Sequence, residues 1–340
     1  PRMSSESETC KAIVASEFGG PEVLVAKDIP RPRVSGPEDV AVQIFASGVN
    51  PVDTYIRSGS YAYKPTLPYV PGKDGAGIVT EVGTGVTQFR PGDRVYIVDS
   101  AAGTAATHAV IHASKCHALP RHLTFAEGAA IGVPYATAYR ALFQRALAKP
   151  GRNVLIHGAS GAVGIACVQL AHARGLTVFG TASSARGREL VKAQGAARVF
   201  DHSADGYLDE ILEATGGRGV DVIVEMLSNV NLGADLRLLS RGGVVAVVGC
   251  RGPVEVNPRD LMAREASVVG VMLGGATEDD KREIFSALHV GFEAGLYKPV
   301  VGDLFPLERA ADAHKAVLAH SGGAAGKVVL VVAEGAEEAA

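Results

Sequence analysis

The chain has 340 residues, of which 47% are hydrophobic and 20% are charged. This composition is typical of a globular chain with a sizeable core; it suggests two domains and excludes a disordered or fibrous protein. The 33 Lys and Arg residues against 36 Asp and Glu residues leave a net charge of −3, so no basic excess is available to neutralise nucleic-acid phosphates. No apolar run reaches the roughly 18 residues that a membrane-spanning helix needs.

The first part of the chain, up to about residue 125, predicts short strands separated by turns. Pro71-Gly72 and Pro91-Gly92 are two of the turn signals. Short strands with frequent turns predict a β-rich barrel or sandwich. The expected strands are residues 11–15, 40–46, 77–82, 94–98 and 108–112.

After residue 125 the pattern changes, and strands alternate with helices. The expected strands are residues 154–157, 177–181, 197–200, 220–226, 243–249 and 267–273, and the helices between them are 163–173, 186–193, 207–215 and 232–239. Several of these strands are continuously apolar, as expected of parallel strands covered on both faces. Six strands with helical crossovers predict a doubly wound dinucleotide-binding fold. The tail predicts a helix at residues 278–293 and then a mixed α/β end.

The sharpest local signal is the segment from Asn153 to Gly164, in which an apolar strand leads through a turn of small residues into a helix. Small residues at Ala159, Gly161 and Gly164 let the backbone approach a pyrophosphate, and the helix N-terminus holds its charge. The alternative is a tight turn without a ligand. The strand, turn and helix order and the five further strands favour a dinucleotide site.

The end of the following strand indicates which dinucleotide is bound. Proteins that select NAD usually place Asp or Glu there to bind the ribose 2′-hydroxyl. Residues 179–184 contain no acid, and Arg186 and Arg188 follow. Hydroxyl and guanidinium groups suit a 2′-phosphate, although both arginines would also fit a solvated helix face. The missing carboxylate favours NADPH.

Six segments spread over almost the whole chain carry a family resemblance: residues 18–24, 48–59, 128–135, 157–161, 225–231 and 257–260. On these segments the chain resembles the zeta-crystallin type of NADPH:quinone oxidoreductase within the medium-chain dehydrogenase/reductase superfamily. The resemblance implies an α/β protein with two domains. A catalytic, β-rich GroES-like barrel comprises residues 1–127 and 274–340, and a doubly wound Rossmann domain that binds NADPH comprises residues 128–273, with a cleft at their junction.

The resemblance also implies the activity, the reduction of quinones with electrons from NADPH. Ortho-quinones are the expected class, and one-electron steps that give the semiquinone stay open beside two-electron reduction. The alternative enzyme is an NADPH-dependent reductase of 2-alkenals or enones, whose substrate is an activated alkene. The alternative from another class is a crystallin-like protein with secondary binding of AU-rich RNA, for which the sequence offers no basic stripe.

Zinc-dependent members of the superfamily use a Cys and a Gly-His-Glu motif, and the corresponding places here read Gly-Val-Asn at residues 48–50 and Gly-Lys-Asp at residues 72–74. Neither Asn50 nor Lys73 is a zinc ligand. A second set, His108, His112, Cys116 and His117, lies in a segment that reads as extended, where these side chains would not converge. We therefore expect no zinc, and hydride transfer to an acceptor that is already electrophilic.

The resemblance places Asn50 and Tyr55 beside the nicotinamide as the catalytic residues, with Tyr55 also contacting the cofactor. An amide and a phenol can donate hydrogen bonds without changing charge. The alternatives are that Asn50 caps the turn before Pro51 and that Tyr55 is a side chain on the barrel rim.

Further cofactor contacts are implied where the strands of the dinucleotide domain end, which is where open α/β sheets bind ligands. They are Ser160, Gly161, Ala162, Val163, Ser183, Arg188, His202, Asn231, Val248, Gly249, Cys250, Arg251, Val271, Met272 and Leu273. The chain departs from the family pattern at residues 103–109, which lack the usual aromatic and acidic residues, and at Lys73. These departures leave the exact acceptor open.

The four cysteines are Cys10, Cys116, Cys167 and Cys250, and they lie far apart with no Cys-x-x-Cys pair. Dispersed cysteines in a long chain predict a reducing compartment, and the cytoplasm is the default. The resemblance implies a homo-oligomer, either a dimer or a homotetramer. The apolar strand at residues 267–273 is the expected edge for pairing across a two-fold axis.

Overall fold

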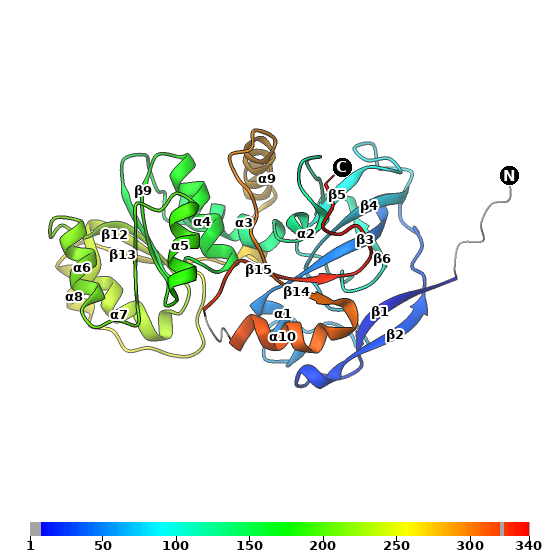
Figure 1. Cartoon of the computed structure of the whole chain (residues 1–340), viewed down its shortest axis with the longest axis horizontal. Helices are drawn as coiled ribbons and strands as arrows, with labels where there is room; N and C mark the ends of the chain where they lie inside the picture. Colours follow the sequence, from blue (N-terminus) through cyan, green and yellow to red (C-terminus); the bar gives the residue numbers. More distant parts are fainter. Residues whose placement is uncertain (1–7, 320–322, 340) are drawn as a thin grey trace. The chain divides into compact units, whose positions relative to one another are not determined.

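The computed structural model describes residues 8–319 and 323–339, and the chain divides into two compact units (Figure 1). The first unit contains Pro1–Val133, Lys298–His320 and Lys327–Ala340; the second contains Pro134–Tyr297 and Ser321–Gly326. The division differs from the expected boundaries at 127/128 and 273/274. The larger difference is that helix α9 (Glu278–Glu293) lies in the second unit.

The position of α9 follows from its contacts within the second unit. Phe292 packs edge-on against Tyr135, with ring centroids 4.9 Å apart. Arg140 Nη1 donates to Asp280 Oδ2 at 3.0 Å. The buried positions Ile284, Leu288 and Phe292 recur at helical spacing, so the apolar face of α9 is covered by its own unit.

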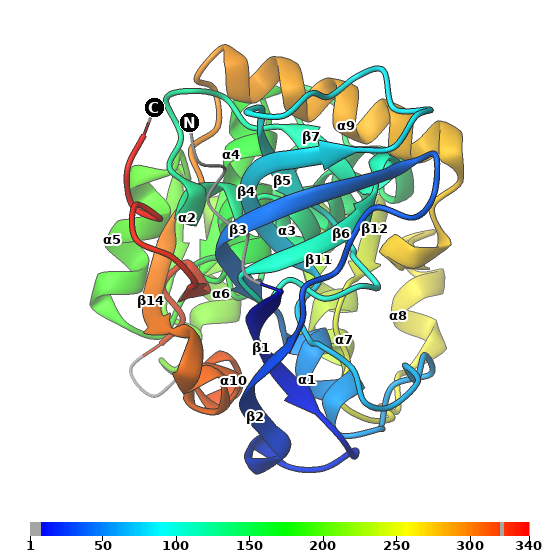
Figure 2. The same ribbon diagram turned by 90° about the vertical axis from the view of Figure 1, so that its right-hand side faces the viewer.

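The first unit is built on a seven-stranded sheet with the order β14-β15-β3-β4-β5-β7, and β6 also pairs with β3. Figure 2 shows β3, β4 and β5 side by side. The strands of this sheet are β3 (Asp39–Val49), β4 (Asp74–Val82), β5 (Arg94–Ile97), β6 (His108–His112), β7 (Cys116–Ala118), β14 (Val301–Pro306) and β15 (Lys327–Val331). A separate antiparallel pair is formed by β1 (Thr9–Ala15) and β2 (Leu24–Pro30).

All five strands predicted for the first part of the chain are present as β1, β3, β4, β5 and β6. The short helices of this unit are α1 (Pro51–Arg57) and α2 (Phe125–Gly128), and the longer α10 (Ala310–Ala319) comes from the tail. The sheet is completed by β14 and β15, also from the tail, and β15 runs antiparallel to β3 with Val328 opposite Val49. The expected mixed α/β end is therefore part of the first unit.

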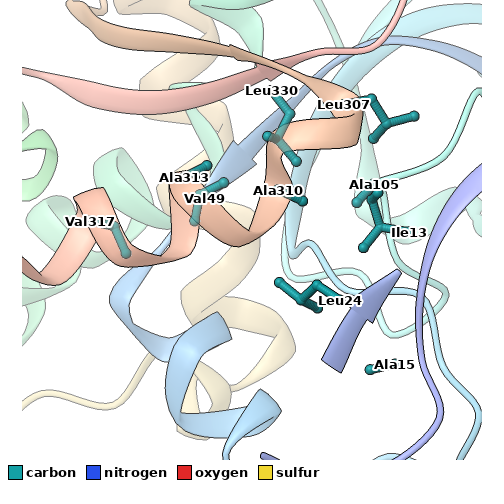
Figure 3. Packing of buried hydrophobic residues seen from close by; sticks show 10 residues of the cluster. All are labelled: Ile13, Ala15, Leu24, Val49, Ala105, Leu307, Ala310, Ala313, Val317 and Leu330. Atoms are coloured by element: carbon teal, nitrogen blue, oxygen red, sulfur yellow. The ribbon is translucent and has the colours of Figure 1, made fainter. Parts of the chain in front are cut away.

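One core of the first unit joins segments far apart in the sequence (Figure 3). Ala310, Ala313 and Val317 are buried at helical spacing along α10, and they pack with Val49 of β3 and Leu330 of β15. Burying such side chains contributes about 25 cal/mol per Å² of apolar surface. The tail is thus bound to the first part of the chain by a shared apolar core.

A buried polar network joins the same segments. Lys327 Nζ lies 2.8 Å from Asp74 Oδ2 and donates to Asn50 Oδ1. Asn50 Nδ2 donates to Asp74 Oδ2 at 2.9 Å, and the Val133 N–H donates to Asp74 Oδ1 at 2.8 Å. Lys327 is 2% exposed and Asp74 is fully buried, so each charge depends on the other for stabilisation.

Lys327→Met is expected to reduce the free energy of unfolding by about 3–5 kcal/mol, because it leaves the Asp74 carboxylate buried and unpaired. The matched control is Lys298→Met. Lys298 lies 3.5 Å from Glu127 on the surface of the same unit, and a pair of this kind contributes about 0–1 kcal/mol. Denaturant unfolding measures both variants, and equal losses would contradict this account. Adding Asp74→Asn to Lys327→Met is expected to recover part of the loss.

The second unit contains a six-stranded parallel sheet with the order β10-β9-β8-β11-β12-β13. Numbered along the chain within this unit, the order is 3-2-1-4-5-6, that of a doubly wound dinucleotide fold. The strands are β8 (Asn153–Ile156), β9 (Thr177–Thr181), β10 (Arg198–Phe200), β11 (Val220–Glu225), β12 (Leu239–Val247) and β13 (Ser267–Gly270). All six predicted strands are confirmed.

The helices of the second unit include α4 (Ala162–Ala173), α5 (Ala185–Ala193), α6 (Tyr207–Ala214), α7 (Ser228–Leu238) and α8 (Pro258–Met262), and α3 (Gly132–Tyr139) leads into the unit. The predicted helix at 232–239 begins earlier, at Ser228, and ends before Leu239, which starts β12. The first four residues of this helix are Ser, Asn, Val and Asn, which have low helix propensity, so the sequence pattern did not reveal its first turn. Among the described residues, no helix is both long enough and apolar enough to cross a membrane.

Candidate active site

The glycine-rich turn lies between β8 and α4 in the second unit. Gly158 has a φ of +57°, which favours glycine. A Cβ on Gly164 would lie 2.4 Å from Gly158 O and 2.6 Å from Ala159 Cα, so only glycine allows the helix to pack this closely on the turn. The first N–H groups of α4 have no partner within the helix. The turn therefore has the form that a pyrophosphate requires.

Gly326, which is distant in the sequence, also contacts this turn. The Gly326 N–H donates to Ser160 O at 2.8 Å, and Gly161 and Gly326 form an isolated parallel bridge. The sequence pattern contained no signal for this contact, because residue 326 lies outside the alternating strands and helices that identified the dinucleotide fold.

After the end of β9 the two arginines, Arg186 and Arg188, have different environments. Arg188 Nη1 donates to Asp201 Oδ2 at 2.6 Å and to Ser183 O at 2.7 Å, so an acid offsets its charge. Arg186 is exposed at the start of α5, and it pairs with no carboxylate among the described residues. Ser183 is also exposed. Within the described part of the chain, Arg186 and Ser183 thus have no acid beside them that offsets a charge. The sequence analysis expected Ser183 and both arginines to suit a 2′-phosphate, and the contact of Arg188 stays a prediction.

The other predicted cofactor contacts of the second unit follow β10 to β13, and the carboxyl ends of parallel strands meet at one edge of the sheet. His202 follows β10; burial, and then the charge of His157, lower its pKa. Asn231 lies on α7 and its Nδ2 donates to both carboxylate oxygens of Glu225 at 3.2 Å. The remaining contacts are Val248, Gly249, Cys250 and Arg251 after β12, and Val271, Met272 and Leu273 after β13.

Cys250 differs from the other cysteines because it is exposed. Its Sγ donates to Gly252 O at 2.8 Å. A hydrogen bond from the Ser228 hydroxyl, followed by the Gly252 backbone, lowers the pKa of the Cys250 thiol. The thiol is therefore a polar group at the sheet edge, while Cys10, Cys116 and Cys167 are buried.

The first unit contains the two residues predicted to be catalytic. Asn50 is the N-cap of α1, and its N–H donates to Asp53 Oδ2 at 2.8 Å. Its side chain is buried in the network with Lys327 and Asp74. Tyr55 is half-buried on α1. Asn50 thus orders the start of the helix, and Tyr55 is the side chain with a phenol donor.

A hollow near α1 is formed mostly by side chains that the sequence analysis did not single out, with Lys73 as the exception. Its walls are Asp53, Ile56, Tyr63, Pro65, Tyr69, Val70, Pro71, Gly72, Lys73, Ser100 and Ala101. Burial and then the nearby Asp74 raise the pKa of Asp53 to about 6, although the Asn50 N–H opposes this. Burial raises the pKa of Tyr69 to about 12, and its buried hydroxyl has no partner among the described residues.

Lys73, the unusual residue in its segment, has a defined environment in this hollow. Its Nζ lies 2.9 Å from Asp99 Oδ1 and 5.4 Å from the centroid of the Tyr63 ring. The Asp99 carboxylate is also 3.5 Å from Lys115 Nζ. Burial works to lower the pKa of Lys73, but the hydrogen bond to Asp99 and the charge of Asp99, together with smaller contributions, raise it overall. Lys73 is therefore a protonated ammonium group.

The residues at the places of the zinc ligands do not fit zinc. An ammonium has no lone pair for a metal, and the Asn50 amide is engaged with Lys327 and Asp74. In the second set, His112 Nε2 lies 2.7 Å from Glu38 Oε2, and His117 stacks on Tyr96. Over residues 8–319 and 323–339, three or more metal-type side chains gather only at His157, Glu225 and Asp235, a cluster that the sequence analysis missed.

Comparison with known proteins agrees with this two-part architecture. The chain matches the alcohol dehydrogenase GroES-like domain over residues 36–143 and the zinc-binding dehydrogenase domain over residues 162–289. These matches confirm the predicted fold class, a GroES-like domain with a Rossmann-type domain. They define an oxidoreductase of the medium-chain dehydrogenase/reductase type.

The quinone oxidoreductases of Rattus norvegicus and Homo sapiens are 48% and 46% identical to this chain, over 97% of it and 100% of their own lengths. The structure of Escherichia coli quinone oxidoreductase complexed with NADPH has a TM-score of 0.83 and 30% identity, covering 95% of this chain and 99% of that one. The chain belongs to the quinone oxidoreductase group of the medium-chain dehydrogenase/reductase superfamily.

Gly164→Ala is expected to weaken NADPH binding at least about tenfold, because the new methyl group would displace the turn backbone. The matched control is Gly233→Ala on α7, where a Cβ meets no atom within 4 Å. The control is expected to bind NADPH normally and to gain up to about 1 kcal/mol of stability. Fluorescence titration with NADPH and thermal unfolding measure the two effects. Unchanged NADPH affinity in Gly164→Ala would show that the turn does not hold the dinucleotide.

Proposed function

We propose that the protein is an NADPH-dependent quinone oxidoreductase that acts without zinc. The observation that carries this proposal is the carboxyl edge of the second unit's sheet, where the glycine-rich turn and exposed hydroxyl and guanidinium groups replace the acid that NAD selection requires. The names of the relatives, quinone oxidoreductases at 46–48% identity, support the acceptor class. The mismatch between zinc and the groups at Asn50 and Lys73 supports the absence of zinc.

When bound, NADPH would supply the hydride, and the residues of this chain would bind and orient the reactants. The turn from Ser160 to Val163 would hold the pyrophosphate through its N–H groups other than that of Gly161, which already donates to Gly158 O at 3.0 Å. Ser183 and Arg186 would hold the 2′-phosphate. The Tyr55 hydroxyl would donate a hydrogen bond to the acceptor oxygen, and Asn50 would keep the start of α1 in place. Arg188 would position Ser183 through its bonds to Ser183 O and Asp201.

An exposed sheet edge in the second unit favours an assembly of identical chains, a dimer or a tetramer. Strand β13 is at one end of the six-stranded sheet, and Val268 on it is 39% exposed. An edge strand with an exposed apolar side chain is suited to pairing with a second copy across a two-fold axis.

NADPH is expected to bind at least about tenfold more tightly than NADH, a difference of about 1.4 kcal/mol, because the 2′-phosphate meets Ser183 and Arg186. Ser183→Asp places a carboxylate there and is expected to shift the preference toward NADH. Ser286→Asp, an exposed serine on α9, is the matched control and is expected to keep the preference for NADPH. Fluorescence titration with both dinucleotides measures the ratio, and equal wild-type affinities would contradict the 2′-phosphate assignment.

The activity itself is tested by steady-state oxidation of NADPH with ortho-quinones and with 2-alkenals, using protein treated with a chelator. Turnover with quinones is expected to exceed turnover with alkenals. Tyr55→Phe is expected to lower the quinone rate at saturating NADPH about 10- to 100-fold, since it removes one neutral hydrogen bond while quinone oxygens can take protons from water.

Two results would overturn parts of this proposal. Turnover restricted to alkenals would assign the protein to the enone reductases. A loss above about a thousandfold with quinones in Tyr55→Phe would show that the phenol is an obligatory proton donor, because general acid catalysis contributes about 10²–10⁴-fold.

A further inference from the structure

Two carboxylates and one imidazole meet directly before the glycine-rich turn. His157 follows β8, Glu225 ends β11 and Asp235 lies on α7, and all three are buried. Parallel pairing of β8 with β11 places Ile156 opposite Val224, so the next residues along both strands, His157 and Glu225, are neighbours. His157 Nε2 lies 2.9 Å from Asp235 Oδ1 and 3.7 Å from Glu225 Oε2.

This cluster contacts the groups expected to bind the dinucleotide on two sides. On one side, His157 Nδ1 lies 3.3 Å from Thr181 Oγ1, which also accepts the Gly158 N–H at 3.2 Å. The carbonyl of Thr181 accepts the Ala159 N–H at 2.9 Å. On the other side, Asn231 Nδ2 donates to both oxygens of Glu225. The cluster therefore holds the turn and Asn231 at once.

The charges of the cluster do not cancel. An imidazolium and one carboxylate are neutral together, so ionisation of the second carboxylate leaves one negative charge in the interior. Burial raises the pKa of Glu225 to about 7, and Asp235 adds to this effect against the charge of His157. Burial works to lower the pKa of His157, but the hydrogen bond to Asp235 and the two carboxylates raise it overall. The proton count of the cluster thus changes near neutral pH.

Two further titratable groups face the cluster from neighbouring elements. Burial and the charge of His157 lower the pKa of His202, which follows β10. Burial raises the pKa of Tyr207 on α6, and Asp235 and Glu225 act in the same direction. Both groups are therefore neutral around pH 7, and the change in charge there belongs to His157 and Glu225.

The three side chains also offer the donor atoms of a metal site. The oxygens of Glu225, however, are already approached by N–H donors from Leu227 and Asn231. These N–H groups need the Glu225 oxygens as acceptors. A metal cation bound to the same oxygens would lie close to the partial positive charges of the N–H groups and be repelled by them. Asp235 Oδ2 has no hydrogen-bond partner among the described residues. Since the ligand atoms of the three side chains lie within 4.8 Å of one another, this oxygen can accept a proton shared within the cluster. A shared proton accounts for both observations.

We propose that His157, Glu225 and Asp235 share a proton and act as positioning residues for the glycine-rich turn and Asn231, so that loss of this proton weakens dinucleotide binding. The proposal rests on the proposed function, because it takes NADPH as the ligand of the turn. Deprotonation adds a buried negative charge next to the backbone that would hold the pyrophosphate, and like charges repel strongly where water is excluded. Binding of the dinucleotide accordingly favours the protonated cluster.

The test is the dissociation constant of NADPH between pH 6.0 and 8.5, measured by fluorescence titration. In the wild-type protein it is expected to rise about three- to tenfold as the pH passes 7, since the protonated form binds more tightly. Glu225→Gln keeps the shape of the side chain without its charge and is expected to remove this slope. Glu213→Gln, an exposed residue on α6, is the matched control and is expected to retain it. NADH, which has no 2′-phosphate to titrate, is expected to show the same slope.

Equal slopes in the wild type and Glu225→Gln would overturn the proposal. If Glu225→Gln does not fold, calorimetry of the wild type in buffers with different ionisation enthalpies decides the question: proton uptake on NADH binding at pH 7.5 supports the proposal, and no uptake overturns it. Failure of both NADPH and NADH to bind at any pH would instead contradict the proposed function.

Discussion

The first unit depends on one buried ion pair, that of Lys327 with Asp74. The two residues are 253 positions apart in the chain, and their contact closes a unit whose sequence is interrupted by the whole of the second unit. Because both charges are inaccessible to water, neither is stable alone, and the pair forms only when β15 lies beside β3. Asn50 bridges the two charges. The start of α1, and with it Tyr55, is therefore ordered by a residue from the end of the chain.

In the second unit, the electrostatic requirement is the stabilisation of a negatively charged ligand. A dinucleotide brings several negative charges to the carboxyl edge of a sheet, and in the proposed function the turn after β8 would bind them with backbone N–H groups instead of cations. The two arginines near this edge are not equivalent, because Asp201 already offsets the charge of Arg188 while Arg186 is exposed. In the proposed function, specificity for a 2′-phosphate would depend on Ser183 and Arg186, and Arg188 would contribute through its hydrogen bond to Ser183 O.

Buried polar groups occur in both units at the places where function is proposed. Asn50 and Asp53 lie at the start of α1, and His157, Glu225 and Asp235 lie before the glycine-rich turn. Burying such groups costs free energy that an apolar core would not cost. These groups make particular hydrogen bonds that fix one arrangement of the backbone, which is what a site for an oriented hydride transfer requires. These buried polar groups lower the stability of the fold but fix the positions of the residues around the proposed sites.

The sequence by itself determined the elements whose signals are local. Continuous apolar runs revealed the six parallel strands, and the small residues at Ala159, Gly161 and Gly164 revealed the turn, because strand period and glycine geometry depend on near neighbours. The resemblance added Asn50 and Tyr55 as candidates without their surroundings. Only the tertiary structure decided that Lys327 neutralises Asp74, that Asp201 binds Arg188 and that His157 meets Asp235. These contacts join residues on different strands and helices. A single sequence carries no signal for such pairs, since charge and burial at one position do not specify the partner that the fold brings to it.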